Sequence, residues 1–522
     1  MASLEFSGTL TPSDPYDKAV LIVGQLKHLV KLKFKDVQCK LGGRVDAETF
    51  DTSIGSLHPT PTDQCSLWLN SATVAALPLK CSRHNTPSRC HSLTKLVKNC
   101  LAGGQEYIVI VCERENVFAS GLAVARALPL YSAKSNSTSG SRKVTVEFLV
   151  IEDERIAQLN EEELQCLRAA ADGVRLAAKI VDMPCSEMNV HHFVKEVEDV
   201  AKELKVSVQI ISGDDLAAKG MGGIYGVGKA ATSPPAMAIL SHVVPNSTEA
   251  IAWVGKGIVF DTGGLCIKAK AGMCGMKRDC GGAAAVLGAF KTAVKLGFSQ
   301  TLHAILCLAD NAVGPEAQRP DDIVYMYSGR SVEINNTDAE GRLVLGDGVA
   351  YAVKDLGCTT IVDMATLTGA QGIATGKYHA SILTNNENLE TTCWKIGRSC
   401  GDLVHPVPFS PEMHSSEFSS AVADMKNSVA DRSNAQVSCA GLFIMSHLGH
   451  DFLGSWLHID MAAPAYSGER ATGYGVALLA ALFGDRSHNS LLRLVGPPGQ
   501  VRNNGSNMEE DIADGPKRIK LT

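Results

Sequence analysis

The chain has 522 residues, of which 45% are hydrophobic and 20% are charged, and its formal net charge is −6. These values are ordinary for a globular protein of roughly two to four domains. They give no electrostatic support for broad nucleic-acid binding, and no uninterrupted apolar run of about 18 residues predicts a membrane span.

The signals for cellular location are sparse. Residues 1–6 lack a basic stretch followed by an apolar run, so no secretory leader is expected. Sixteen cysteines are spread over the chain without a dense framework, which predicts reduced thiols in a cytoplasmic protein. One candidate zinc group consists of Cys81, His84, Cys90 and His91. Its last two residues are adjacent in the sequence, which is not the ligand spacing of a structural zinc site.

The first part of the chain predicts an α/β domain over residues 1–165. Residues 18–23, 107–112 and 145–152 are short β-like runs. Residues 132–143 are Ser-rich and polar and are expected to form a flexible surface loop. Residues 161–181 have helical periodicity and would connect this domain to the next.

Strands and helices alternate from about residue 182 onward. The strand candidates are residues 207–211, 251–260, 301–308 and 360–364, and the helix candidates between them are 282–296 and 343–354. This alternation predicts a mostly parallel sheet with helices on both faces. The fold class is therefore α/β: a smaller N-terminal α/β domain, followed over residues 166–495 by a larger C-terminal domain whose central, mostly parallel sheet is covered by helices.

Residues 496–522 differ from the rest of the chain. Pro, Gly and Asn are frequent in 496–505 and residues 509–514 are acidic, which predicts a disordered tail. Residues 516–521, Pro-Lys-Arg-Ile-Lys-Leu, resemble a short nuclear-import signal, and a solvated tail is the favoured alternative.

The first polar cluster lies between residues 254 and 285. Lys256 and Asp261 fall in or beside an apolar strand-like run, and Lys268 and Asp279 follow among glycines. Burying such charges is costly unless they are paired or bind a metal. A buried salt bridge between Lys256 and Asp261 is the simpler alternative, but it would not need the nearby glycines, which let backbone and ligands approach closely.

The second cluster reads Asn-Asn-Thr-Asp-Ala-Glu-Gly-Arg-Leu at residues 335–343. Asp338 and Glu340 are two residues apart, so an extended backbone would place both carboxylates on one side, with Arg342 following on that side. Three aspartates, one glutamate and a deprotonated lysine suit a pair of divalent cations that could hydrolyse an amide. The chain has no His-Glu-x-x-His, so a single-zinc helix site of that kind is not supported.

The chain resembles the leucine aminopeptidase family of dinuclear metallo-exopeptidases. The resemblance rests on Asn-Thr-Asp-Ala-Glu-Gly-Arg-Leu at 336–343, Gly-Lys-Gly-Ile-Val-Phe-Asp-Thr-Gly-Gly at 255–264 and Met-Lys-Arg-Asp at 276–279. Asp-Met-Ala-Thr-Leu-Thr-Gly-Ala at 363–370 and Trp-Leu-His-Ile-Asp-Met-Ala at 456–462 also match. Weaker similarity spans about 169–483, and no motif is recognised in the N-terminal third.

The resemblance implies a metal-dependent aminopeptidase that releases unblocked N-terminal residues from short peptides, using two divalent cations, Zn²⁺ or Mn²⁺. Asp261 and Glu340 would be shared by the two cations, Lys256 and Asp279 would complete the tighter site, and Asp338 would complete the more exchangeable one. Lys268 would stabilise the tetrahedral intermediate, and Arg342 would hold a bicarbonate ion as general base. The implied substrate-binding residues are Met276, Thr366, Leu367, Gly369 and Ala462.

The chain departs from the family pattern just after the last matched block. Ala463 replaces the glycine usual in the last block, followed by Pro464 and Ala465, so we expect the pocket for the first side chain to differ from that of relatives.

The resemblance also implies a homohexamer with enclosed active sites and a cytoplasmic location. A catalytically weak or inactive member that acts as a scaffold or regulatory binder is the alternative function, and a plain amidohydrolase is a third.

Overall fold

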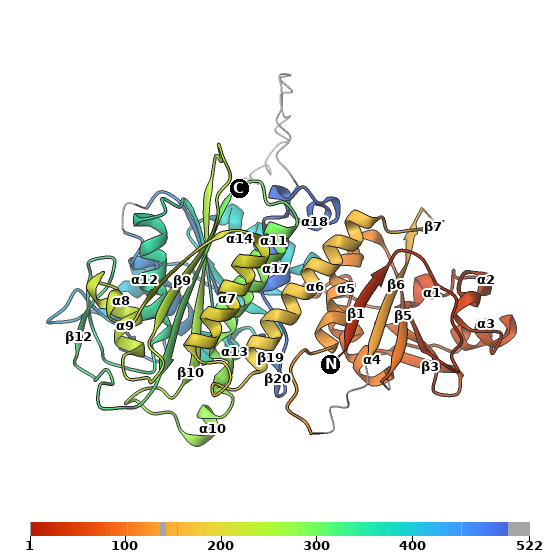
Figure 1. Cartoon of the computed structure of the whole chain (residues 1–522), viewed down its shortest axis with the longest axis horizontal. Helices are drawn as coiled ribbons and strands as arrows, with labels where there is room; N and C mark the ends of the chain where they lie inside the picture. The colour runs from red at the N-terminus through yellow and green to blue at the C-terminus, as the bar shows by residue number, and fades with distance from the viewer. Residues whose placement is uncertain (1, 102, 136–141, 154, 450–451, 499–522) are drawn as a thin grey trace, which may run out of the picture.

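The structure is a computed structural model that describes residues 2–101, 103–135, 142–153, 155–449 and 452–498 (Figure 1). Residues 136–141 of the predicted loop at 132–143 lie outside the described residues. So do residues 499–522, which hold most of the predicted tail and the whole basic run at 516–521. Within the described residues, no helix combines the length and the apolar composition needed to cross a bilayer.

The N-terminal part is built on a seven-stranded sheet with the order β1-β6-β5-β2-β4-β3 and with β7 paired to β6. The pairs along the path from β1 to β4 are parallel, whereas β3 and β7 are antiparallel to their neighbours. The strands are β1 (Ser3–Ser7), β2 (Ala19–Gln25), β3 (Asp63–Trp68), β4 (Ala72–Leu77), β5 (Gln105–Cys112), β6 (Lys143–Glu152) and β7 (Arg155–Ala157). The three predicted strands are confirmed as β2, β5 and β6.

One long helix joins the two parts of the chain. Helix α6 (Glu161–Asp182) begins where the Asn160 side chain accepts from the backbone of Glu163 and the Glu163 carboxylate accepts from the backbone of Asn160. It packs against α5 (Val117–Ala127) on one side and α11 (Gly281–Lys295) on the other. The predicted helix at 161–181 is confirmed. The predicted domain boundary between residues 165 and 166 falls inside this helix and stays a prediction.

The larger part contains an eight-stranded sheet with the order β16-β15-β18-β14-β10-β11-β9-β8. Its four central strands, β18, β14, β10 and β11, are parallel, and antiparallel pairs flank them on both sides. The strands are β8 (Ser207–Ser212), β9 (Ala236–His242), β10 (Ala250–Asp261), β11 (Thr301–Asn311), β14 (Thr360–Ala365), β15 (Ala380–Thr384), β16 (Val404–Pro406) and β18 (Ser455–Asp460). All four predicted strands are confirmed, and the sheet is parallel at its centre and mixed at its edges.

Helices cover both faces of this sheet, as the alternation along β10 requires. Ile251 and Trp253 belong to one hydrophobic core, whereas Ala252 and Val254 belong to another. The first core is closed by α6, α7 (Val190–Leu204), α11 and α17 (Val476–Leu482), and the second by α9 (Gly222–Gly228), α12 (Gly341–Lys354) and α16 (Gln436–Ser446) (Figure 1). The predicted α/β fold class with two covered faces is confirmed.

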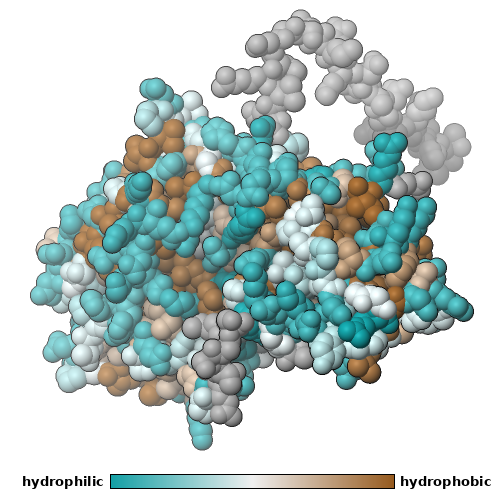
Figure 2. Space-filling view, turned by 45° about the vertical axis from the view of Figure 1, so that its right-hand side comes forward, coloured by the Kyte–Doolittle hydropathy of each residue, from teal (hydrophilic) through white to brown (hydrophobic). Residues whose placement is uncertain are grey.

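The remaining elements are short connections or lie at the edges. The helices are α1 (Leu26–Leu29), α2 (Phe34–Val37), α3 (Ala47–Gly55), α4 (Cys90–Cys100), α8 (Asp214–Ala218), α10 (Lys270–Met273), α13 (Gly369–Ala374), α14 (Glu387–Cys400), α15 (Pro411–His414) and α18 (Ser490–Val495). The 3₁₀ turns are η1 (Gln38–Lys40), η2 (Arg114–Asn116), η3 (Met276–Cys280), η4 (Ser415–Phe418) and η5 (Gly484–Arg486), and the minor strands are β12 (Ile323–Tyr325), β13 (Ser331–Glu333), β17 (Met425–Lys426), β19 (Tyr466–Ser467) and β20 (Arg470–Ala471). On the face drawn in Figure 2, polar side chains cover most of the surface and apolar groups lie between them.

Candidate active site

A cavity of about 510 Å³ opens at the carboxyl ends of the central parallel strands. Its wall takes residues from the end of β10, from the loops that follow β14 and β18, from η3, and from the turn before α12. Parallel α/β sheets place their sites at this edge, because the chain leaves every strand there through a loop. All twelve residues singled out from the sequence line this one cavity: Lys256, Asp261, Lys268, Met276, Asp279, Asp338, Glu340, Arg342, Thr366, Leu367, Gly369 and Ala462.

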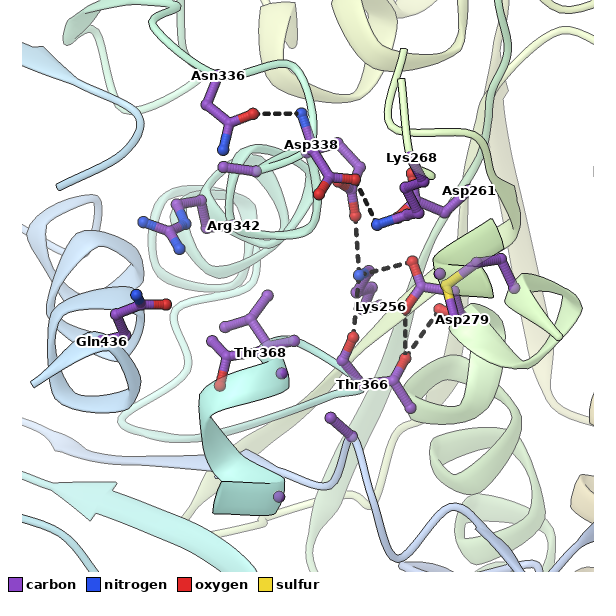
Figure 3. A pocket seen from close by; sticks show the side chains of 18 of the residues that line it. Lys256, Asp261, Lys268, Asp279, Asn336, Asp338, Arg342, Thr366, Thr368 and Gln436 are labelled. Atoms are coloured by element: carbon purple, nitrogen blue, oxygen red, sulfur yellow. Dashed lines mark hydrogen bonds and ion pairs between the residues drawn. The ribbon is translucent and has the colours of Figure 1, made fainter. Parts of the chain in front are cut away.

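Lys256 lies at the centre of the charged cluster (Figure 3). Its Nζ is 2.7 Å from an oxygen of Asp279 and 2.8 Å from an oxygen of Glu340, and it donates to the Thr366 carbonyl at 3.0 Å. The side chain is almost completely buried. The alternative salt bridge between Lys256 and Asp261 is therefore wrong, since the partners of Lys256 come from η3 and from the start of α12.

Lys268 pairs with the other two carboxylates. Its Nζ is 2.7 Å from an oxygen of Asp261, and it also pairs with Asp338. Asp261 is held further by the Asn311 side-chain amide at 2.8 Å and by the Gly263 backbone N–H at 2.9 Å. Two lysines thus lie among four carboxyl groups, so the cluster contains two more acidic groups than basic ones.

Burial disfavours the charged form of Asp279, Asp338 and Glu340. Burial raises the pKa of Glu340 to about 8, with a further contribution from the neighbouring Asp261 charge. Burial also raises the pKa values of Asp279 and Asp338. Burial disfavours the charged form of Lys256, but Asp279 and Glu340 outweigh it and raise the pKa of Lys256 far above its ordinary value. The cluster is therefore an environment in which added positive charge is strongly favoured.

The donor set suits a divalent metal. Asp261, Asp338 and Glu340 each offer an oxygen, and the three oxygens lie within 4.8 Å of one another. The second oxygen of Glu340 is buried and has no hydrogen-bond partner within the described residues. Carboxylate oxygens with an unsatisfied lone pair are ligands for Mg²⁺, Mn²⁺ and Zn²⁺, so these residues fit a bound cation.

The short motif around Asp338 is not extended, so the backbone predicted for it is wrong. Residues 337 and 338 form a turn, and Glu340 already has helical φ and ψ angles as the residue before α12. Asn427 fixes this turn, because its side-chain oxygen accepts from the backbone of Asn335 and Asn336 and its amide donates to the Asn336 carbonyl. The two carboxylates share the cavity because of this turn.

Arg342 is a buried cation beside the cluster. Its Nη1 donates to the Asn427 carbonyl at 3.0 Å, while its Nε is buried without a hydrogen-bond partner in the described part of the chain. Burial lowers the pKa of Arg342 to about 10, a value that still leaves the guanidinium charged near neutral pH. An unpaired buried guanidinium donor that lines a cavity fits a bound anion.

Asp460 joins the two segments predicted to contact a substrate. The buried Asp460 carboxylate accepts from Leu367 N at 3.1 Å, from Thr368 Oγ1 at 2.6 Å and from Ala462 N at 3.2 Å. Thr366 in turn donates through Oγ1 to Asp279 at 2.9 Å. The two segments predicted to contact a substrate and the charged cluster are therefore connected by hydrogen bonds.

Three supporting residues were not identified as functional from the sequence. Asp460 lies inside the matched block at 456–462, and Asn311 is the last residue of β11. Asn427 follows β17 and belongs to no recognised motif. Their partners are far away along the chain, so only the tertiary contacts identify them.

The candidate zinc group of cysteines and histidines does not converge on a common point. Among the residues that the structure describes, Asp261, Asp338 and Glu340 form the only group of three or more acidic, His or Cys ligands close enough to share an ion. The Cys81 thiol instead donates to the Thr86 carbonyl, and the Cys90 thiol to the Gly401 carbonyl. Zinc binding at Cys81, His84, Cys90 and His91 is therefore not supported.

Models of known families match most of the chain. The catalytic domain of the cytosol aminopeptidase family, peptidase M17, matches residues 175–480, and the M17 aminopeptidase N-terminal domain 2 matches residues 18–137. The second match covers the N-terminal part, where no motif was recognised by inspection.

Individual relatives match nearly the whole chain. The probable aminopeptidase NPEPL1 of Homo sapiens is 58% identical over 499 residues, which cover 95% of both chains. Leucine aminopeptidase 1 of Caenorhabditis elegans is 42% identical over 488 residues, covering 91% of this chain and 96% of the relative.

Solved structures have the same architecture. The structure of C. elegans leucine aminopeptidase has a TM-score of 0.89 at 39% identity, covering 94% of this chain and 99% of that chain. The leucyl aminopeptidase of Trypanosoma brucei in complex with bestatin has a TM-score of 0.81 at 35% identity. The match covers 91% of this chain and 94% of that chain.

Proposed function

The chain belongs to the cytosol aminopeptidase family and is a metal-dependent aminopeptidase, and we propose that its charged cluster holds two divalent cations with which it removes unblocked N-terminal residues from short peptides. The observation that carries this proposal is the convergence of four carboxylates and two lysines at the carboxyl edge of the sheet.

The proposed ligand assignment is the one that the family resemblance implies, and the contacts within the cluster support it. Glu340 pairs with Lys256 and Asp261 with Lys268, and these two carboxylates would be shared by both cations, while Lys256 and Asp279 would complete one site and Asp338 the other. Lys256 must lose its proton to serve as a nitrogen ligand. The binding of two divalent cations next to it would make that loss favourable. Zn²⁺ and Mn²⁺ both accept such a mixed oxygen and nitrogen set.

When bound, such a pair of cations polarises the substrate carbonyl and lowers the pKa of a water molecule between them. The remaining steps belong to the protein's own side chains. Asp279, held by Thr366 Oγ1, would accept a hydrogen bond from the free α-amino group, which explains why a blocked terminus would not bind. The Lys268 ammonium would stabilise the negative charge that develops on the carbonyl oxygen, an effect worth roughly 3–4 kcal/mol for a well-placed donor.

Proton transfer would use an anion held by Arg342. The guanidinium is fixed by Asn427 and keeps an unpaired buried Nε, so a bicarbonate ion could bind there and act as general base. The backbone of Thr366, Leu367 and Gly369 would align the peptide, and Met276 and Ala462 would line the pocket for the first side chain.

The assembly and the cellular location are also proposals. Family membership supports a homohexamer whose enclosed sites admit only short peptides, and the cytosol aminopeptidase name of the family supports a cytoplasmic location. The net charge of −6 supports a protein without a nucleic-acid partner. Nuclear import through residues 516–521 is a separate proposal, and loss of a nuclear fraction on deletion of residues 515–522 would test it.

Hydrolysis of leucine amide by the chelated and then metal-loaded protein tests the function. We expect no turnover after chelation, recovery with Mn²⁺ or Zn²⁺, and no hydrolysis of acetyl-leucine amide. Glu340→Gln keeps the side-chain shape but removes one charge, so it should lose both activity and metal uptake. Full activity of the metal-free protein, or cleavage of the acetylated substrate, would contradict the proposal. An inactive scaffold finds no support in any contact of the site or in any relative.

A further inference from the structure

Arg278 and Tyr466 form a stacked pair in the wall of the active-site cavity. Arg278 follows Met276 by two residues in η3, and Tyr466 follows Ala462 by four residues at the start of β19. The carbon at the centre of the guanidinium lies 3.5 Å from the centroid of the Tyr466 ring, and both side chains line the cavity. The pair therefore comes from the same two chain segments as the proposed pocket for the first side chain.

The hydrogen-bonding capacity of Arg278 is unused. Within the described residues its guanidinium makes no hydrogen bond and no ion pair, and its contact is the face of the Tyr466 ring. Other sheltered arginines differ: Arg126 is paired with Asp402, and Arg175 donates to the Leu128 carbonyl. Stacking on an aromatic ring fixes the plane of a guanidinium and leaves its N–H groups pointing outward in that plane.

Apolar and small residues from the same region of the chain also line the cavity. Met276, Ala462 and Ala463 line it beside the pair, and Gly372 lies next to Ala463. A side chain that fits such a surface has methylene groups along its stem and, at its end, a planar acceptor of two parallel hydrogen bonds. Glutamate has this chemistry, since its carboxylate matches the fork of an arginine. Lysine or arginine at the same place would be repelled.

We propose that Arg278, held flat on Tyr466, binds the side chain of the first substrate residue and makes the enzyme selective for an acidic residue, above all glutamate. The inference rests on the proposed aminopeptidase function and specifies its substrate class. Such selectivity is strong where a site offers polar groups that a wrong substrate leaves unpaired.

The test compares kcat/KM for the p-nitroanilides of glutamate, glutamine, leucine and lysine with the Mn²⁺-loaded enzyme. We expect glutamate to exceed glutamine by about tenfold or more, because glutamine has the same shape but lacks the charge and has a donating NH₂ group in place of one acceptor oxygen. Arg278→Gln should bring that ratio close to one. The ratio is taken within each variant, so a loss of folded protein cancels.

Arg432→Gln is the matched control. Arg432 also lines the cavity and makes no ion pair within the described residues, but it precedes α16 and is not adjacent in sequence to Met276 or Ala462. If Arg278 recognises the side chain locally, Arg432→Gln leaves the ratio of glutamate to glutamine within about threefold of the parent, whereas a general positive field would make both variants lose it.

Three results would overturn the inference: a parental ratio at or below one, a ratio unchanged in Arg278→Gln, or an equal fall in Arg432→Gln. Hydrolysis of leucine p-nitroanilide distinguishes the two proposals. If this substrate is cleaved and Arg278 has no role in selectivity, only the present inference is refuted. Calorimetric titration of free glutamate and glutamine requires no turnover, and equal binding of both to the parent would also refute it.

Discussion

Replacing Asp460 by asparagine should weaken the link between the two segments proposed to contact the substrate without changing the shape of the side chain. The carboxylate ends β18 and accepts from Leu367 N, Thr368 N and Ala462 N through one oxygen and from Thr368 Oγ1 through the other. In Asp460→Asn, an NH₂ group would face a threonine oxygen that already accepts from Gln371 N at 3.1 Å. The contact to Thr368 Oγ1 is then the one most disturbed.

The magnitude follows from the count of bonds. Hydrogen bonds to a charged group contribute about 1.5–3 kcal/mol each and neutral ones about 0.5–1.5 kcal/mol. Weakening three N–H contacts and disturbing the hydroxyl contact should lower the free energy of unfolding by about 2–4 kcal/mol. Because the common anchor of Leu367 and Ala462 is weakened, kcat/KM for leucine amide should fall by about 10- to 100-fold, the scale of effect produced by small displacements of positioning groups.

Asp363→Asn is the matched control for stability alone. Asp363 is buried in β14 and accepts from Trp456 Nε1 at 2.8 Å and from His458, and it does not line the cavity. Both variants should lower the thermal midpoint, but only Asp460→Asn should lower kcat/KM per folded molecule. Equal kcat/KM in the two variants would refute the positioning role of Asp460.

Three further predictions concern stability. Lys40 and Glu147 form a fully buried ion pair at 2.9 Å. Lys40→Met should therefore lower the free energy of unfolding, measured by calorimetry, by about 3–5 kcal/mol, and the double variant with Glu147→Leu should recover most of that loss. Burial lowers the pKa of His91 to about 4 and that of His447 to about 3, so the unfolded chain binds more protons and stability is lost as the pH falls below about 6.5. The thermal midpoint should therefore fall as the pH is lowered below about 6.5, and His447→Gln should make this pH dependence weaker. A Cβ on Gly282 would overlap the Met364 carbonyl, so Gly282→Ala should cost about 3 kcal/mol or more, whereas Gly55→Ala, with open space around it, should change the midpoint little.

The secondary structure of the catalytic part could be predicted because its signals are local. Apolar runs between glycines marked β10, β11 and β14, and helical periodicity marked α6, α11 and α12, each within a few residues of its observed bounds. The strands β9 and β15 were not predicted, and their antiparallel pairing with β11 and β18 was not predicted either, because an alternation of strand and helix does not indicate which strands are neighbours.

The residues of the site were also recognisable one by one, since acids and lysines in an apolar setting, together with a specific motif, single themselves out. Their pairing was not. The one pairing considered from the sequence, as the alternative to metal binding, was Lys256 with Asp261, five positions away, whereas the fold pairs Lys256 with Glu340 and Lys268 with Asp338. A turn braced by Asn427 replaces the extended backbone expected at Asp338.

The amino-acid order by itself determined the elements, the family resemblance and the set of chemical groups, because propensity, periodicity and motifs act over short stretches of chain. Only the tertiary structure decided which charges meet, that Asp460 ties Leu367 to Ala462, and that Arg278 lies flat on Tyr466 with its donors free. The physical reason is that these contacts join loops that leave different strands at one edge of a sheet, and their distances are set by strand order and packing rather than by separation along the chain.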